Sequence, residues 1–136
     1  MPRAKKPIAF RNTKRRDPKK ASAQREAVLE RDGFRCVALS VDGLRCWDTN
    51  PPRLQCAHLI RRRACGDAIY DPDVAVTLCE LDHDILDHRA PIALWDSIVI
   101  PSEAIDRAEA CVRRYEADRA SRGLAVVPLK NREAVK

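Results

Sequence analysis

The stretch that decides the fold runs from an apolar segment straight into a polar one: Val74-Ala75-Val76-Thr77-Leu78-Cys79-Glu80-Leu81-Asp82-His83-Asp84-Ile85-Leu86-Asp87-His88. The polar half is expected to be helical. Residues four apart lie on the same face of a helix, so His83 and Asp87 are expected to point the same way. Imidazole nitrogen and carboxylate oxygen are both metal ligands. Pro91 follows and ends the helix, because proline cannot continue it.

Two shorter stretches upstream supply more cysteine and histidine. The first is a charged turn that ends in a thiol, Arg31-Asp32-Gly33-Phe34-Arg35-Cys36, and Cys46 comes after it. The second places a histidine in an apolar setting, Cys56-Ala57-His58-Leu59-Ile60. These stretches therefore contain most of the cysteines and all of the histidines of this chain, the residue types that commonly bind transition metals.

The segments between these stretches give a coarse secondary structure. Helix formers fill residues 21–32 and are followed by a glycine, where a left-handed cap is expected. Residues 34–60 are short β-prone pieces broken by turn residues, which predicts a hairpin-like ribbon. Residues 61–73 are polar and are expected to form a loop. A last helix is predicted between an N-cap at Ser102 and Gly123, from apolar residues at helical spacing: Ile105, Ala108, Val112 and Tyr115.

A chain of 136 residues has room for one modest domain with tails. We expect a basic flexible arm at 1–20, a domain at 21–90, a helical extension at 91–123 and a flexible tail at 124–136. Aromatic residues are 4% of the chain, so the core must rest on aliphatic side chains. A metal bound by some of the six cysteines would help to hold such a core together.

Residues 25–90 resemble the HNH endonucleases, also called ββα-metal or His-metal-finger nucleases, and in particular their zinc-containing bacterial and phage subgroup. In that subgroup a helix leads into an Arg-Asp-Gly-x-x-Cys turn, and a later strand ends in a histidine. An Asn-x-x-x-Leu-Cys stretch then precedes a helix that opens with Cys-His or His-His. The resemblance implies an α+β fold with a small ββα-metal core and a structural zinc. The basic arm and a helix would precede this core, and a C-terminal helix would follow it.

Hydrolysis of a phosphodiester needs a base that deprotonates water and a cation that neutralises the leaving oxygen. The resemblance assigns the first role to His58. Ala57 stands directly before it, where the family usually has a metal ligand. The resemblance assigns a catalytic Mg²⁺ or Mn²⁺ ion to His83 and Asp87, and a carboxylate suits either ion. Asp82 and His88 flank this pair as alternative ligands.

The family's middle asparagine orients the base or the loop, and it aligns with Val74. The valine side chain forms no hydrogen bonds. Asp73 or Asp71 would take over this role after a small shift in register, so Asp73 is a candidate catalytic residue.

The resemblance also implies four ligands for the structural zinc. Three of the family's positions hold cysteines here: Cys36, Cys46 and Cys79. The fourth position falls on Asp82, where cysteine or histidine is usual. Aspartate binds zinc through oxygen, although cysteine is commoner in structural sites. A competing set takes its fourth ligand from Cys56, Cys65 or His83.

The net charge of +6 is concentrated at one end of the chain. Residues 1–20 hold nine Lys and Arg against Asp17 alone, a charge of +8, and the remainder holds 17 basic and 19 acidic residues, a charge of −2. Basic side chains release counterions when they bind phosphates, so the arm is a candidate DNA contact, above all through Lys14, Arg15 and Arg16. A disordered solubilising tail or a nuclear-import signal would have the same composition.

A second basic run directly follows the predicted base and consists of Arg61, Arg62 and Arg63. In that position the three side chains would hold phosphates beside the scissile bond and fix the position of the DNA without reading its sequence. A solvated loop is the alternative interpretation.

No secretion signal is expected, since the first apolar residues lie inside the basic arm. No apolar stretch approaches the ~20 residues that span a bilayer, so no membrane partner is expected. Cysteines in a reducing compartment favour metal ligation over disulfides. We therefore expect a cytoplasmic protein of a bacterium or of a phage-infected cell, and a secreted disulfide protein is the alternative.

Three functions are compatible with these features. The leading one is a metal-dependent DNA endonuclease that uses His58 as its base. The second is a catalytically inactive HNH-like zinc module that binds nucleic acid or a protein partner, its chemistry having been lost at Ala57 and Val74. The third is a structural component of a phage or DNA-processing complex.

Overall fold

The computed structural model describes residues 16–124. Its helices and strands follow in the order α1 (Pro18–Arg31), β1 (Leu39–Ser40), β2 (Leu54–His58), α2 (Arg62–Cys65), β3 (Ala75–Cys79), α3 (Glu80–Leu86), β4 (Ile98–Val99) and α4 (Ser102–Ser121). Helices alternate with two small antiparallel sheets, which confirms the expected α+β class. Within residues 16–124, no helix is both long and apolar enough to cross a bilayer.

Helix α1 begins earlier than its composition predicted, because two residues fix its first turn. The carboxylate of Asp17 accepts hydrogen bonds from two backbone N–H groups, those of Lys19 and Lys20. Pro18 takes the first helical position, where its fixed φ suits a helix and its missing N–H is not needed. Residues 18–20 are therefore helical, which corrects the arm boundary expected at residue 20.

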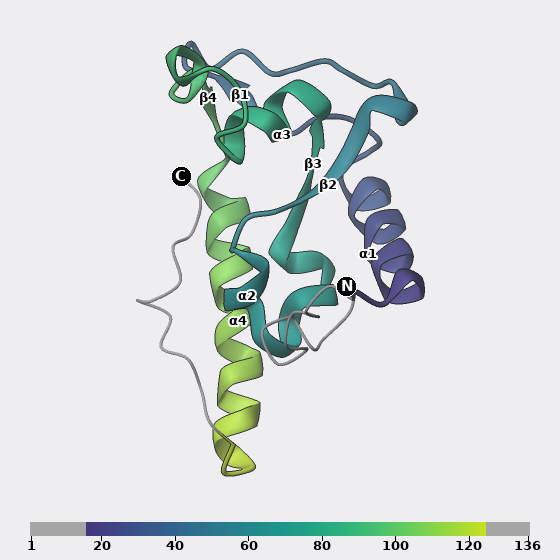
Figure 1. Ribbon diagram of the computed structural model, residues 1–136, viewed down its shortest axis with the longest axis vertical. Helices are drawn as coiled ribbons and strands as arrows, with labels where there is room; N and C mark the ends of the chain where they lie inside the picture. The colour runs from purple at the N-terminus through teal and green to yellow at the C-terminus, as the bar shows by residue number, and fades with distance from the viewer. Residues whose placement is uncertain (1–15, 125–136) are drawn as a thin grey trace, which may run out of the picture.

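The centre of the fold is the antiparallel pair of β2 and β3, which leads directly into α3. In this register His58 at the end of β2 lies opposite Ala75, and Leu54 lies opposite Cys79 at the end of β3. Helix α3 begins at Glu80, the residue after β3, and it packs against both strands. Figure 1 shows the pair in the middle of the molecule, with α1 on one side and α4 on the other.

The strands pair differently from the ribbon expected over residues 34–60. Strand β1 pairs with β4, where Leu39 lies opposite Val99, and β2 pairs with β3. Around the predicted turn at residues 42–43 the chain forms an isolated bridge between Leu39 and Arg45. The turn residues at 42–43 therefore indicated only a local reversal of the chain. The strands pair instead with segments that are distant in sequence.

The segment at 61–73, expected to be a loop, is largely helical. It consists of α2 and of two 3₁₀ turns, η3 (Gly66–Tyr70) and η4 (Pro72–Val74). The carboxylate of Asp71 caps η4 by accepting a hydrogen bond from the N–H of Asp73 at 2.9 Å. Both turns pack against α4, so this segment connects β2 to β3 across the face of the last helix.

Helix α4 buries one face, made by Ala104, Ala108, Cys111 and Val112. Its start corrects the sequence prediction: Ser102 is the first helical residue, and Pro101 holds the cap position without a side-chain hydrogen bond. The predicted end is close, because the helix stops at Ser121, shortly before Gly123. Figure 1 shows α4 along one side of the molecule, with its last turns extending past the neighbouring elements.

The capped start of α1 gives a test of this packing. Replacing Asp17 with alanine removes the acceptor for two helix N–H groups, so it should lower the free energy of unfolding by about 0.5–2 kcal/mol. Denaturant titration of the purified protein measures the change. Glu26→Ala, on the exposed face of the same helix, is the matched control and should change stability by less than about 0.5 kcal/mol. Equal stability of the two variants would contradict the capping role.

Candidate functional site

Four potential metal ligands from distant parts of the chain meet in one cluster. Their ligand atoms all lie within 4.8 Å of one another and belong to Cys36, Cys46, Cys79 and Asp82. The first two come from the loops around β1, and the last two come from the end of β3 and the first turn of α3. This is the set of residues that the resemblance implied, and it can hold a metal ion.

The chemistry of this cluster suits a cation. The Cys36 thiol donates a hydrogen bond to Asp82 Oδ2 at 3.1 Å, and Asp82 is only 7% exposed. Burial raises the pKa of the Cys36 thiol, and it raises the pKa of Cys79 to about 11. A buried carboxylate is unfavourable without a neighbouring cation, and a bound metal ion would displace the thiol protons. Three sulfurs and one oxygen are compatible with a tetrahedral zinc site.

The structure places the competing fourth ligands elsewhere. The Cys65 thiol lies 3.4 Å from the carbonyl oxygen of Ile60. Cys56 lines a pocket, and His83 contacts Gln55 and Asp87. Asp82 is therefore the fourth member of the cluster.

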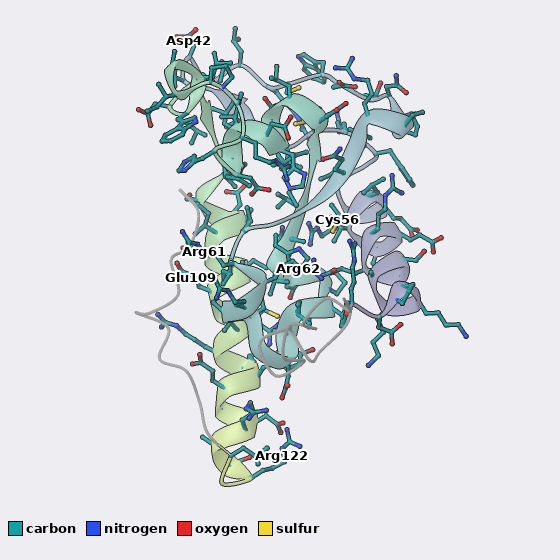
Figure 2. The ribbon with its side chains drawn as sticks, in the orientation of Figure 1. Asp42, Cys56, Arg61, Arg62, Glu109 and Arg122 are labelled. Atoms are coloured by element: carbon teal, nitrogen blue, oxygen red, sulfur yellow. The ribbon has the colours of Figure 1, made fainter. Side chains whose placement is uncertain are left out.

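A pocket of about 500 Å³ brings together the other predicted site residues. Its lining includes His58 from β2, His83 from α3 and Asp87 directly after α3. Five arginines also line it: Arg16, Arg25, Arg61, Arg62 and Arg89. In Figure 2 two lining residues, Cys56 and Arg62, lie between α1 and α4. The predicted base and the predicted metal pair thus share one basic pocket.

The hydrogen bonding of His58 leaves Nδ1 as the ring nitrogen that can accept a proton. Its Nε2 lies 2.9 Å from the carbonyl oxygen of Ile69, which can only accept, so Nε2 carries the proton and Nδ1 keeps a lone pair. Burial lowers the pKa of His58. The hydrogen bond to Ile69 opposes this effect, and the charges of Arg62 and Arg16 reinforce it. The ring is therefore neutral near pH 7.

His83 has an oxygen atom beside each of its ring nitrogens. Nδ1 lies 2.5 Å from Gln55 Oε1, and Nε2 lies 3.1 Å from Asp87 Oδ2. A neutral imidazole carries a single proton, so only one of these contacts is an ordinary hydrogen bond. The other contact would be satisfied by a second proton, by a cation, or by a turn of the Gln55 amide that presents its NH2 to Nδ1.

A cation between His83 and Asp87 is one arrangement that is compatible with this contact. Burial lowers the pKa of His83, although the charge of Asp87 opposes the effect, so burial disfavours the doubly protonated ring. Adjacent ligands of a small octahedral ion such as Mg²⁺, with bonds of ~2.1 Å, lie about 3 Å apart. The separation of 3.1 Å between His83 Nε2 and Asp87 Oδ2 is compatible both with a direct hydrogen bond and with such an ion.

The structure does not bring Asp73 to His58, which corrects its assignment as a catalytic residue. Its carboxylate forms an ion pair with Arg114 of α4 at 3.1 Å. Asp71 faces the same helix and accepts a hydrogen bond from the Tyr115 hydroxyl at 2.9 Å. Both carboxylates turn away because η4 packs against α4.

The pocket lining does not include Ala57, Val74 or His88. Ala57 and Val74 are 0% exposed and belong to the hydrophobic core. His88 stacks its ring on Trp95, with ring centroids 4.2 Å apart. Neither His88 nor Asp82 therefore joins the pair of His83 and Asp87.

The predicted phosphate contacts divide into three groups. Arg61 and Arg62 line the pocket, as does Arg16 at the start of the described chain. Arg63 is exposed and does not contribute to that lining. The arm residues Lys14 and Arg15 lie outside the described residues.

Sequence reasoning missed four residues of the site. Gln55 contacts His83, and Gln24 of α1 lies near His58. Arg25 donates a hydrogen bond to the carbonyl oxygen of Leu54, and Arg89 lies 3.5 Å from Asp87. Arg89 is close to Asp87 in sequence and was detectable by charge. Gln24 and Arg25 reach the pocket only through the packing of α1, which no local pattern reveals.

A second group of possible ligands is made of Asp71, Asp73 and Cys111, whose ligand atoms also lie within 4.8 Å of one another. Arg114 and Tyr115 already bind its two carboxylates, so we interpret this group as a structural contact between η4 and α4.

Comparison with family models, with curated proteins and with solved structures finds no match for this chain.

Proposed function

We propose that this protein is a metal-dependent DNA endonuclease of the HNH type. The observation that carries the proposal is the shared pocket, in which His58 lies with a histidine–carboxylate pair and five arginines. His58 is the general base, and His83 with Asp87 holds a Mg²⁺ or Mn²⁺ ion. The cluster that contains Asp82 holds a structural zinc.

The arginines supply the affinity for a polyanion. Among the charged residues of the lining, five are arginines and one is Asp87, so positive charge prevails. Guanidinium groups bind phosphate oxygens through paired hydrogen bonds, and such contacts position a nucleic acid without reading its bases. Arg62 and Arg16 are close enough to lower the pKa of His58, so phosphates bound by them lie beside the base.

In the reaction His58 accepts a proton at Nδ1 from a water molecule as the water attacks phosphorus. The hydrogen bond from Nε2 to Ile69 keeps the ring in the required tautomer before the transfer. The same hydrogen bond stabilises the imidazolium that the transfer produces, because the charged ring is a stronger donor.

His83 and Asp87 hold the divalent ion, and Gln55 orients His83 by accepting the proton of its Nδ1. When bound, the ion supplies Lewis acidity that neutralises negative charge on the leaving 3′ oxygen. The resemblance implies products with 5′-phosphate and 3′-hydroxyl ends.

Cleavage of plasmid DNA in the presence of Mg²⁺ or Mn²⁺ tests the proposal. His58→Ala removes the base and should lower the cleavage rate by about 10²- to 10⁴-fold. Gel electrophoresis of the nicked and linear products measures the rate, and zinc content shows that the variant remains metal-loaded.

The third histidine provides the matched control for this experiment. His88 has a φ of 59°, which asparagine tolerates, so His88→Asn should cut at nearly the wild-type rate. Clean DNA binding without cutting in any metal would reject the enzyme. Because Ala57 and Val74 supply neither a ligand nor a hydrogen bond, that outcome would identify the chain as the inactive zinc module.

The pH profile tests the role of His58 separately. The base must be unprotonated, so cleavage should rise with pH and reach half its maximum below the ordinary histidine pKa of about 6.5, because burial lowers the pKa of His58. Arg62→Gln removes a charge that lowers this pKa, so its midpoint should move to higher pH. Rates of the two proteins, measured at pH values that preserve zinc content, give the midpoints. A wild-type midpoint above the ordinary value would contradict this assignment.

Metal analysis tests the cluster. The purified protein should contain about one zinc per chain, and acidification should release it as the thiolates are protonated. Cys79→Ser and Asp82→Ala should each lower the zinc content and the unfolding temperature. The matched control is Cys65→Ser, which changes a buried thiol outside the cluster and should keep its zinc. A folded protein free of metal would rule out the zinc site.

A further inference from the structure

Gln24 is a buried polar residue on α1, far in sequence from the motif. Its side chain is 4% exposed. The amide nitrogen Nε2 donates hydrogen bonds to two backbone carbonyls of the segment between β2 and β3, to Ile69 at 2.8 Å and to Asp71 at 2.9 Å. An amide group has two N–H donors, so both are used by these carbonyls.

The same Ile69 carbonyl also orients His58. His58 Nε2 lies 2.9 Å from this oxygen and 3.5 Å from Gln24 Nε2. Since both amide protons of Gln24 point to carbonyls and an amide nitrogen does not accept, His58 Nε2 has the carbonyl as its partner. A carbonyl oxygen has two lone pairs and can accept from both donors.

We infer that Gln24 is a positioning residue, which holds the carbonyl of Ile69 where it selects the Nε2-protonated tautomer of His58. This assignment rests on the proposed function, because the tautomer of His58 matters for catalysis only if His58 is the general base. Gln24 thereby supplies from α1 the carboxamide that the resemblance expects at position 74, where Val74 lies in the core.

The segment that Gln24 holds is fixed from two sides. Gln24 binds its backbone from α1, and Tyr115 of α4 binds the Asp71 carboxylate at 2.9 Å. Without the carboxamide, the carbonyls of Ile69 and Asp71 would lose their donors from α1. The segment would then be free to shift, and His58 would lose the fixed acceptor that selects its tautomer.

Side-chain ¹⁵N NMR of the zinc-loaded full chain at pH 7.5 tests this inference, because protonated and unprotonated imidazole nitrogens resonate far apart. The chain has three histidines, so the signals of His58 can be assigned with His58→Ala. The wild type should show a protonated Nε2 and an unprotonated Nδ1 at His58. Gln24→Leu should give a mixture of tautomers at His58 and leave the signals of His88 unchanged.

The matched control is Val28→Ala, which removes buried volume one helical turn along α1 without touching the carbonyls. It should lose stability and keep the wild-type His58 signals. Cleavage should fall by about 10- to 100-fold in Gln24→Leu, the range seen when a partner that orients a metal-binding histidine is lost, and should be nearly unchanged in Val28→Ala.

Two spectroscopic outcomes would overturn the inference: a wild-type His58 protonated on Nδ1, or wild-type His58 signals in Gln24→Leu. An equal loss of cleavage in the two variants would also overturn it, because it would show a general effect of stability. If the wild type does not cut DNA, the proposed function fails, and the spectra still decide whether Gln24 sets the tautomer.

Discussion

The candidate site depends first on the antiparallel pairing of β2 with β3. The register puts His58 at one end of the pair and Cys79 at the other. Helix α3 begins directly after Cys79 and packs back against both strands, so that His83 reaches Gln55 of β2. A shift of one residue would turn alternate side chains to the opposite face. Both halves of the pocket would then lose their alignment, since His58 is carried by one strand and the helix by the other.

Electrostatics give the two histidines of the pocket different properties. Burial lowers the pKa of both rings. At His58 the nearby arginines also lower the pKa, and Nδ1 keeps a lone pair that can accept a proton. At His83 the carboxylate of Asp87 acts in the opposite direction, and the nitrogen beside it can share a cation. The arginines that would bind phosphates in the proposed enzyme therefore also help to keep His58 neutral.

The resemblance to the HNH nucleases singled out the four residues of the cluster and the two pocket histidines, whereas the spacing of the cysteines alone would not have done so. The sequence did not predict the partner of β2, since the turn at residues 42–43 reports only a local reversal. It misplaced Asp73 because the direction of that side chain depends on how η4 packs against α4. Gln24 gave no signal at all. A glutamine within a helix is ordinary, and only the tertiary contact of α1 with the segment at 69–71 gives it a role.

Helix α3 explains why residues of the cluster and of the pocket fall so close together in sequence. It has seven residues, too few for a helix to be stable alone in water. Its first turn is held at the cluster, where the N–H of Asp82 lies 3.4 Å from the Cys79 sulfur. Consecutive helical residues are about 100° apart around the axis, so Asp82 can face the cluster while His83 faces the pocket. A cation at the cluster would therefore stabilise the turn that positions His83. In the proposed enzyme the structural ion would thus help to position the ligand of the catalytic ion, because Asp82 and His83 are adjacent residues.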